Sequence, residues 1–375
     1  MKIIFTGGGT GGHFYPNIAV IESLREISEK NKLVDIDMIY MSDYKYDETA
    51  LFENRVRFIK ISAGKVRRYF SLLNVVDFFK TGIGILTTTL KVYSNFPDVI
   101  FSKGGYAAFP VVVAAKILGI PLVIHESDSV PGKVNMYAGK FAKKIAISFP
   151  SAAKYFPKEK TALIGVPIRK EFLIGAREGA RQFLGLEENT PVIFIIGGSQ
   201  GAQPINDILL DGLEDLVKDY QVIHQCGKNN LKDVKGRSSV ILEKSSNKSR
   251  YHLFDFLNKD ALRMSYSAAD LVVSRAGGTS IFEIAISGKP SILIPLENSG
   301  QDHQKNNAYD YAAAGACDVL EQTNLTPHLL QSEIKRLLAD KPKLEKMSKA
   351  ALAFARPDAA EKIAQELIRL GIEHK

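Results

Sequence analysis

Cysteine is scarce in this sequence: Cys226 and Cys317 are the two among 375 residues. Their spacing matches neither C-x-x-C nor another metal-ligand pattern, and two cysteines are too few for the disulfide framework of a small secreted domain. The scarcity therefore indicates a reducing compartment.

Long apolar runs are also missing. Residues 3–5 are too short a stretch for a secretory signal and lead directly into glycines. The best candidate for a membrane span, residues 107–124, contains Lys116 and is interrupted by Pro110. Such a segment is typical of a buried helix, a turn and a buried strand, so we expect no transmembrane helix.

Acidic residues are fewer than basic ones, and the formal net charge is +8. A basic excess fits nucleic acid, an anionic membrane or a phosphorylated substrate, and the location of the charge has to decide between them. With 45% apolar and 24% charged residues, the chain has the composition of a globular protein. Its length predicts two domains.

Short apolar runs rich in Val, Ile and Phe alternate with helical stretches. Most runs are apolar at both odd and even positions, as expected for strands that helices cover on both faces. The helical stretches, such as residues 16–30 and 109–118, predict βαβ units and a parallel sheet. The runs of the first half are residues 2–7, 36–41, 56–62, 98–102, 121–126 and 143–148.

The pattern restarts at residues 191–202, PVIFIIGGSQGA, where an apolar run again ends in a glycine turn. Two such openings predict an α/β protein with two Rossmann-like domains. We assign residues 1–165 to the first domain and residues 166–355 to the second. Residues 356–375 carry an amphipathic helical pattern, and we expect this C-terminal helix to pack back on the first domain.

The first glycine turn spells G-x-G-x-x-G with Gly7, Gly9 and Gly12. A glycine turn that leads into a helix N-terminus is a general anion site. A nicotinamide dehydrogenase would also need an acidic residue about 20 residues onward, at the end of the second strand. Asp43 lies past that point, so the match is imperfect. His13 is either a packed capping residue or a proton acceptor at the start of the helix.

Two further glycine turns are GGSQGA and SRAGGTSIFE. No lysine follows any of the glycine turns in the manner of a Walker motif, which favours a nucleotide-diphosphate ligand over ATP hydrolysis. The polar loops HESDSVPGKVN and QDHQKNNA also follow strands and suit a hydroxyl-rich sugar. Neither loop has the spacing of a metal site.

Taken together, these segments resemble the MurG family of peptidoglycan N-acetylglucosaminyltransferases, in glycosyltransferase family 28. The resemblance runs from Gly7 to about Ala308, and its motifs occur in the order found in that family. It implies a GT-B fold with two Rossmann-like domains, and neither a metal ion nor a cofactor. The motifs are GGTGGHFYP, KGGYAAFP, HESDSVPGKVN, GVPIR, GGSQGA, SRAGGTSIFE and DHQKNNA.

The resemblance also implies a reaction. An inverting transferase would move N-acetylglucosamine from UDP-N-acetylglucosamine to the C4 hydroxyl of lipid I, the muramyl-pentapeptide-diphosphoundecaprenol, giving lipid II. The first domain would hold the acceptor and the second most of the donor, with no nucleic-acid partner. The alternatives are a transferase of the same fold acting on a lipid such as diacylglycerol, and a relative that binds UDP without turnover.

Site residues follow from the resemblance position by position. His13 is the expected base for the acceptor hydroxyl, and Glu126 is its rival. The acceptor-side loops contain Gly104, Gly105 and Tyr106. The expected donor-binding residues are Thr10, Gly11, Gly12, Asp128, Arg169, Ser199, Gln200, Leu257, Gly278, Thr279, Ser280, Ile281, Phe282, Glu283 and Gln304.

The sequence departs from the family at two positions. Asp128 stands where the family usually has asparagine, and an ionised carboxylate only accepts hydrogen bonds whereas an amide also donates them. Val166 replaces a second asparagine, whereas Arg169 of the same motif is retained.

Residues 64–93 combine basic and aromatic side chains in an amphipathic pattern. Such a segment either lies on an anionic membrane or packs its apolar side into the core. Since lipid I is a membrane lipid, we expect a peripheral protein at the cytoplasmic face of the inner membrane. The expected membrane contacts are Lys65, Arg67, Arg68, Phe70, Phe78, Phe79 and Lys80.

Overall fold

The computed structural model describes residues 1–31, 36–64, 73–172, 179–198, 201–297 and 299–374, with backbone only for 73–80 and for Glu171. The described chain forms two compact units. The first contains Met1–Arg169 and Arg356–Lys375, and the second contains Lys170–Ala355. Arg169 is thus the last residue of the first unit before the chain enters the second.

The first unit is built on a parallel sheet with the strand order β3-β2-β1-β4-β5-β6-β7. Its central strands are buried on both faces, which explains why they read as continuous apolar runs. The strands are β1 (Lys2–Thr6), β2 (Asp37–Ser42), β3 (Arg57–Lys60), β4 (Val99–Ser102), β5 (Leu122–Glu126), β6 (Lys144–Ile147) and β7 (Thr161–Leu163).

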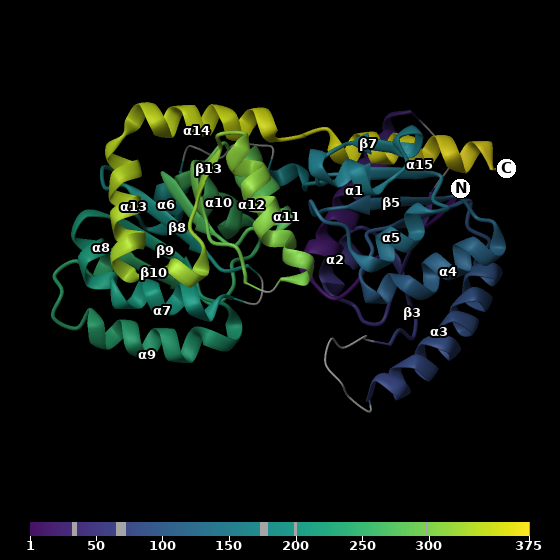
Figure 1. Ribbon diagram of the computed structural model, residues 1–375, viewed down its shortest axis with the longest axis horizontal. Coiled ribbons are helices and arrows are strands. Elements are labelled where there is room, and N and C mark those ends of the chain that lie inside the picture. Colours follow the sequence, from purple (N-terminus) through teal and green to yellow (C-terminus); the bar gives the residue numbers. More distant parts are fainter. Residues whose placement is uncertain (32–35, 65–72, 173–178, 199–200, 298, 375) are drawn as a thin grey trace. The chain divides into compact units, whose positions relative to one another are not determined.

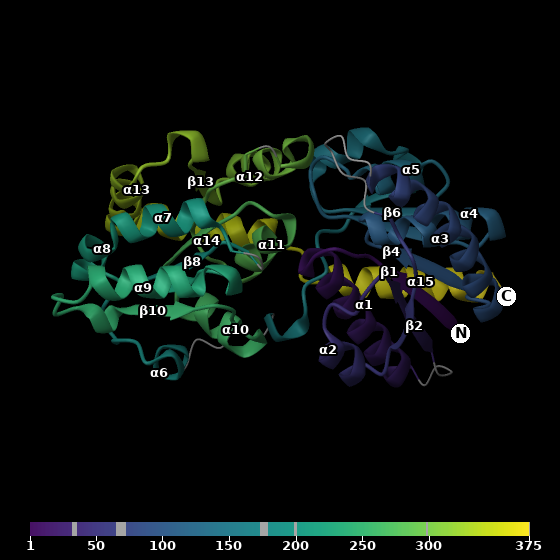
Figure 2. The ribbon, with the colours of Figure 1, turned by 90° about the horizontal axis from the view of Figure 1, so that it is seen from below.

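Helices cover both faces of this sheet, as Figure 2 shows. Ile3 and Phe5 point to the face that packs on α1 and α15, whereas Ile4 between them points to the face of α3 and α4. The helices are α1 (Gly11–Lys30), α2 (Glu48–Glu53), α3 (Leu73–Asn95), α4 (Phe109–Leu118), α5 (Lys133–Gly139) and α15 (Ala359–Glu373), with 3₁₀ turns η1 (Tyr106–Ala108), η2 (Pro150–Tyr155) and η3 (Lys158–Lys160).

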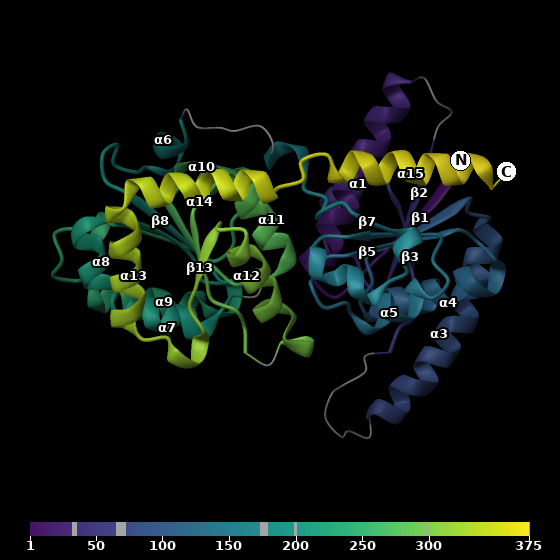
Figure 3. The same ribbon diagram turned by 45° about the horizontal axis from the view of Figure 1, so that its top comes forward.

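The C-terminal helix α15 lies beside α1, although the two are at opposite ends of the chain (Figures 1 and 3). Its apolar stripe, which includes Ile363 and Leu367, joins Leu24 of α1 in one buried cluster. Burial of each such side chain contributes roughly 1.5–3 kcal/mol. The last helix is therefore part of the first unit's core.

The second unit repeats the same plan. Its parallel sheet has the order β10-β9-β8-β11-β12-β13. Phe194 of β8 packs edge-on against Tyr266, with ring centroids 5.2 Å apart, while Ile193 and Ile195 face the other layer of helices. The strands are β8 (Val192–Ile196), β9 (Gln221–Gln225), β10 (Tyr251–Phe254), β11 (Leu271–Ser274), β12 (Ser291–Leu293) and β13 (Cys317–Val319).

The described helices of the second unit are α6 (Ala180–Leu184), α7 (Gln203–Asp211), α8 (Leu213–Asp219), α9 (Leu231–Ile241), α10 (Lys259–Ala268), α11 (Gly278–Ile286), α12 (His303–Ala313), α13 (Pro327–Ala339) and α14 (Lys341–Phe354), with 3₁₀ turns η4 (Lys170–Phe172), η5 (Lys228–Asn230), η6 (Lys248–Arg250), η7 (Gly300–Asp302) and η8 (Gln322–Asn324).

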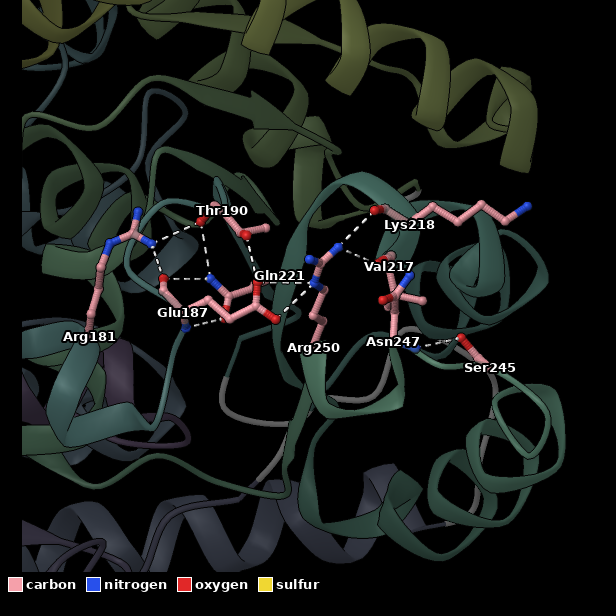
Figure 4. A network of polar contacts seen from close by, with 9 residues as sticks. All are labelled: Arg181, Glu187, Thr190, Val217, Lys218, Gln221, Ser245, Asn247 and Arg250. Atoms are coloured by element: carbon pink, nitrogen blue, oxygen red, sulfur yellow. Dashed lines mark hydrogen bonds and ion pairs between the residues drawn. The ribbon is translucent and has the colours of Figure 1, made fainter.

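A polar network joins the loops at the end of the sheet where β8 and β9 begin (Figure 4). The Gln221 side chain accepts from the Glu187 N–H at 2.7 Å and donates to the Glu187 and Thr190 carbonyls. Arg250 donates to the Glu187 carboxylate at 2.9 Å and to the Lys218 carbonyl at 2.7 Å. These contacts give backbone N–H and carbonyl groups of the loops their hydrogen-bond partners. They lie at the end of the sheet opposite the glycine turns, so their role is structural.

Each sheet has one point where the strand order reverses, between β1 and β4 in the first and between β8 and β11 in the second. Ligands of open α/β sheets bind beyond the carboxyl ends of the strands at such points. The glycine turns follow these four strands, so in each unit they lie at the carboxyl ends of the strands, where ligands are expected.

Candidate active site

The first glycine turn lies between β1 and α1. Gly9 has a φ of +99°, which suits glycine, and Thr10 is the N-cap of α1. Gly11 and Gly12 occupy the first turn of the helix. A helix that starts directly after a glycine turn has the geometry of a general anion site, and anion binding by this one stays a prediction.

His13 also lies in the first turn of α1, and its side chain is half-buried. Its Nδ1 is 3.0 Å from Thr10 Oγ1, and its backbone N–H donates to the Thr10 carbonyl at 3.1 Å. The Thr10 contact helps to fix the orientation of the imidazole ring.

The loop after β4 approaches the first glycine turn. Gly105 has a φ of +80°, and a Cβ added there would lie 2.7 Å from the Gly8 carbonyl and 3.5 Å from His13 Cδ2. A Cβ added at Gly104 would lie 2.8 Å from Asn135 Oδ1, and Tyr106 donates to Asp43 at 2.6 Å. Gly105 therefore lies beside His13, and Gly104 and Tyr106 are its neighbours in the same loop.

The close approach at Gly105 has a measurable consequence. We expect Gly105→Ala to lower the free energy of unfolding by about 2 kcal/mol or more, because it adds a clash to the strain of positive φ. Gly119→Ala is the matched control, since Gly119 has a φ of +69° but nothing within 4 Å of an added Cβ. Urea denaturation measures both, and equal losses would show that contact with Gly8 has no cost.

Glu126 ends β5 and is buried. Its carboxylate accepts from the Asp128 N–H at 3.0 Å, the Gly132 N–H at 3.1 Å and Asn135 Nδ2 at 2.9 Å. Burial raises the pKa of Glu126, and the neighbouring Asp128 carboxylate raises it further. The three donors tie this carboxylate to the loop that carries Asp128.

Arg169 is half-buried, and its guanidinium lies 4.6 Å from the centroid of the Tyr15 ring. Tyr15 belongs to α1, and its hydroxyl donates to Asp47 at 3.2 Å. The cation–π contact brings Arg169 to the first turns of α1.

In the second unit, α11 begins at Gly278 directly beyond β11. Thr279 and Ser280 follow in its first turn, and the apolar Ile281 and Phe282 are buried in the core. Glu283 is half-buried, and the Tyr266 hydroxyl donates to its Oε2 at 3.3 Å. Burial raises the pKa of Tyr266 well above its usual value, so the hydroxyl stays protonated as a donor.

Gln225 links two predicted donor segments. Its Oε1 accepts from the Leu257 N–H at 3.1 Å, and its Nε2 donates to the Gly198 carbonyl at 3.3 Å. The Leu257 N–H thus has a partner within the protein. The predicted Ser199 and Gln200 lie outside the described residues.

Gln304 lies in the first turn of α12. Its Oε1 accepts from the Leu296 N–H at 3.0 Å, so its side-chain amide NH₂ is directed away from that loop. An amide NH₂ can donate to a sugar hydroxyl.

The sequence analysis missed several residues that contact the predicted site residues or their loops. Lys103 and Asn135 stand in quoted motifs but received no role, and Gln225, Tyr266 and Tyr15 were not singled out. Their contacts join residues far apart in the chain, so no local pattern could identify them.

Within the described ranges, no group of three or more His, Cys, Asp or Glu side chains is placed to hold a metal ion. No helix in the same ranges is long and apolar enough to cross a membrane.

Two Rossmann-like units, each with glycine turns where the strand order reverses, are typical of the GT-B class of sugar-nucleotide enzymes. The fold assigns this chain to that class. The chain belongs to glycosyltransferase family 28: residues 3–147 match its N-terminal domain and residues 192–363 its C-terminal domain.

Curated relatives of nearly the same length carry one name. The chain is 38% identical over 338 residues, 90% of this chain and 91% of the relative, to UDP-N-acetylglucosamine–N-acetylmuramyl-(pentapeptide) pyrophosphoryl-undecaprenol N-acetylglucosamine transferase 3 of Bacillus thuringiensis (strain Al Hakam). A transferase of the same name from Clostridium kluyveri is 36% identical, covering 96% of this chain and 97% of the relative.

Among solved structures, MurG of Acinetobacter baumannii is similar, with a TM-score of 0.74 and 25% identity over 98% of this chain and 99% of that one. A UDP-GlcNAc 2-epimerase from Neisseria meningitidis, bound to UDP-GlcNAc, reaches a TM-score of 0.69 at 15% identity over 98% and 100% of the chains. The second likeness concerns the fold alone.

Proposed function

We propose that this chain transfers N-acetylglucosamine from UDP-N-acetylglucosamine to lipid I, giving lipid II for peptidoglycan synthesis. The observation that carries the proposal is similarity along nearly the whole chain to transferases named for this reaction, at 36–38% identity. The glycine turns at the carboxyl ends of the strands in both sheets support the proposal, because backbone N–H groups at such turns bind a diphosphate.

In the proposed reaction the acceptor's C4 oxygen attacks the anomeric carbon from the face opposite UDP. A bond forms between these two atoms, the bond from the anomeric carbon to the β-phosphate oxygen breaks, and its electron pair leaves with UDP. His13 takes the proton of the attacking hydroxyl. Its place at the start of α1, with Nδ1 held by Thr10 at 3.0 Å, supports this role.

Glu126 suits the role of base less well. Both of its carboxylate oxygens accept hydrogen bonds from the loop that follows β5. Proton uptake at Glu126 would weaken these bonds and loosen the loop, whereas proton uptake at His13 leaves them intact.

The proposed roles of the two units differ. The first unit, with Gly104, Gly105 and Tyr106, holds the acceptor, and the second holds most of the donor. Glu283 accepts from the ribose hydroxyls, Gln304 contacts the sugar, and the Leu257 carbonyl contacts uracil. The start of α11 and Arg169 stabilise the negative charge that develops on UDP.

The same proposal requires contact with a membrane, and α3 offers a surface for it. Ile83, Leu86, Leu90 and Tyr93 follow one another at steps of three or four residues, and their exposed fractions are 64%, 64%, 61% and 58%. Side chains so spaced share one helix face. We call these four residues the α3 stripe.

The α3 stripe lies within residues 64–93, the amphipathic segment that the sequence analysis assigns to the membrane. Of the residues expected there, Lys65, Arg67, Arg68 and Phe70 lie outside the described residues, and Phe78, Phe79 and Lys80 belong to the backbone-only start of α3. We propose that the α3 stripe inserts into the cytoplasmic face of the inner membrane while the basic residues contact anionic headgroups.

Charged substitutions in the stripe test membrane binding. We expect Leu86→Glu/Leu90→Glu to weaken binding to anionic vesicles at least about tenfold, because two apolar side chains leave the interface and two negative charges enter it. Phe52→Glu is the matched control, since Phe52 is 83% exposed on α2. Co-sedimentation measures both, and unchanged binding of the double variant would exclude the α3 stripe.

The transfer reaction itself is tested with labelled UDP-N-acetylglucosamine and a short-chain lipid I analogue. We expect label in the lipid product, with diacylglycerol inert as acceptor. Transfer to diacylglycerol in place of lipid I would identify the alternative lipid glycosyltransferase.

A further inference from the structure

Lys103 is a buried lysine that the proposed reaction does not use. It directly follows β4, its backbone N–H donates to the Thr6 carbonyl at 2.9 Å, and only 2% of the residue is exposed. Its Nζ contacts His125 Nδ1 and Ser127 Oγ. Both partners flank Glu126 on the neighbouring strand β5 and the loop after it.

His125 does not share the charge of Lys103. His125 Nε2 lies 2.7 Å from the Gly165 carbonyl, which only accepts, so Nε2 carries the proton and Nδ1 accepts from Lys103. Burial lowers the pKa of His125, and Lys103 lowers it further. The imidazole is therefore neutral.

The carboxylates of Glu126 and Asp128 are close enough to act electrostatically on Lys103. Burial lowers the pKa of Lys103, whereas both carboxylates raise it. The Asp128 N–H also donates to Glu126 at 3.0 Å, so the two acids are joined in one turn. Glu126 is buried and Asp128 is half-buried, so without a cation their neighbouring carboxylates would repel each other.

We propose that Lys103 is a positioning residue that balances the charge of Asp128 and thereby holds the turn 126–129 in its donor-binding conformation. Asp128 stands where the family resemblance predicts a neutral asparagine. The Lys103–Asp128 pair thus replaces a neutral amide with two opposite charges. The donor-binding part of this inference rests on the proposed function.

The contacts of Lys103 argue against two other roles, a direct ligand for a phosphate and a side chain that only fills the core. Burial and two protein partners make the ammonium a poor direct ligand for a phosphate. A stem that merely fills the core would not need Ser127 Oγ and His125 Nδ1 as acceptors.

A double-mutant cycle tests the pair. Lys103→Met keeps the stem volume and removes the charge, and Asp128→Asn removes the opposite charge. We expect Lys103→Met to raise KM for UDP-N-acetylglucosamine about tenfold or more in the Asp128 background and less than about threefold in the Asp128→Asn background. Equal effects in both backgrounds would overturn the proposal, and Lys235→Met controls for loss of a surface cation.

Stability without substrate separates this inference from the proposed function. We expect Lys103→Met to lower Tm, because the turn 126–129 loses its counter-charge, and Asp128→Asn to restore most of the loss. This coupling, together with a wild-type chain that fails to transfer, would support the charge pair and reject the function. A Tm loss that is independent of Asp128, or failure of both the single and the double variant to fold, would contradict the charge pair.

Discussion

Replacing His13 by alanine lowers kcat for N-acetylglucosamine transfer by about 10²–10⁴-fold, the usual contribution of a general base. The acceptor hydroxyl is a weak nucleophile until its proton is removed, and His13 at the start of α1 is the group we assign to remove it. The affinity for UDP stays within about twofold, because the ring is not needed for the diphosphate contacts of backbone N–H groups.

Steady-state kinetics and calorimetric titration with UDP measure the two effects separately. His374→Ala, which removes an exposed histidine at the end of α15, controls for loss of an imidazole. Near-full turnover of the variant would transfer the role to Glu126.

Replacing Glu283 by alanine raises KM for UDP-N-acetylglucosamine about 10–100-fold, since hydrogen bonds to a charged group contribute about 1.5–3 kcal/mol. The carboxylate lies in the second turn of α11, half-buried and oriented by Tyr266. Because the ribose is distant from the bond that breaks, kcat changes less than KM.

Tyr266→Phe is the control for Glu283. It removes the hydroxyl that donates to Glu283 Oε2 at 3.3 Å but keeps the carboxylate and the ring packed on Phe194. We expect it to raise KM only a few-fold. A normal KM in Glu283→Ala would refute the assignment of the ribose contact.

The strands were predictable because burial on both faces leaves a simple signal. The predicted runs 121–126 and 143–148 enclose the observed β5 and β6, which differ only at their ends. Helix starts were less predictable: the sequence placed the first helix at residues 16–30, but α1 begins at Gly11 with Pro16 inside it. Proline usually opens a helix, and here Gly11 and Gly12 already belong to the helix before Pro16 is reached.

The site was predictable only where motifs carry it. The glycine turns and His13 could be found from spacing, since a helix start after a strand is a local feature. Lys103 could not, because its contact with Ser127 depends on the pairing of β4 with β5. The bond from Leu257 to Gln225 likewise joins a loop to β9 and leaves no local trace.

The exposure of the α3 stripe likewise could not be predicted from the sequence. The sequence showed an amphipathic basic segment with two interpretations, a membrane surface or a packed helix. Val92 of α3 is buried in the core, whereas Leu90 and Tyr93 on either side of it are exposed. The packed interpretation is therefore confirmed for the face with Val92, and membrane contact stays a prediction for the exposed face.

The most direct test of the account identifies the product by mass spectrometry after incubation with UDP-N-acetylglucosamine and a short-chain lipid I analogue. UDP-glucose and UDP-N-acetylgalactosamine are present as competitors. The account predicts a lipid-linked disaccharide that is larger by one N-acetylglucosamine, joined β-1,4, with release of UDP. An unchanged lipid I analogue, together with donor that is hydrolysed, epimerised or transferred to another lipid, would contradict it.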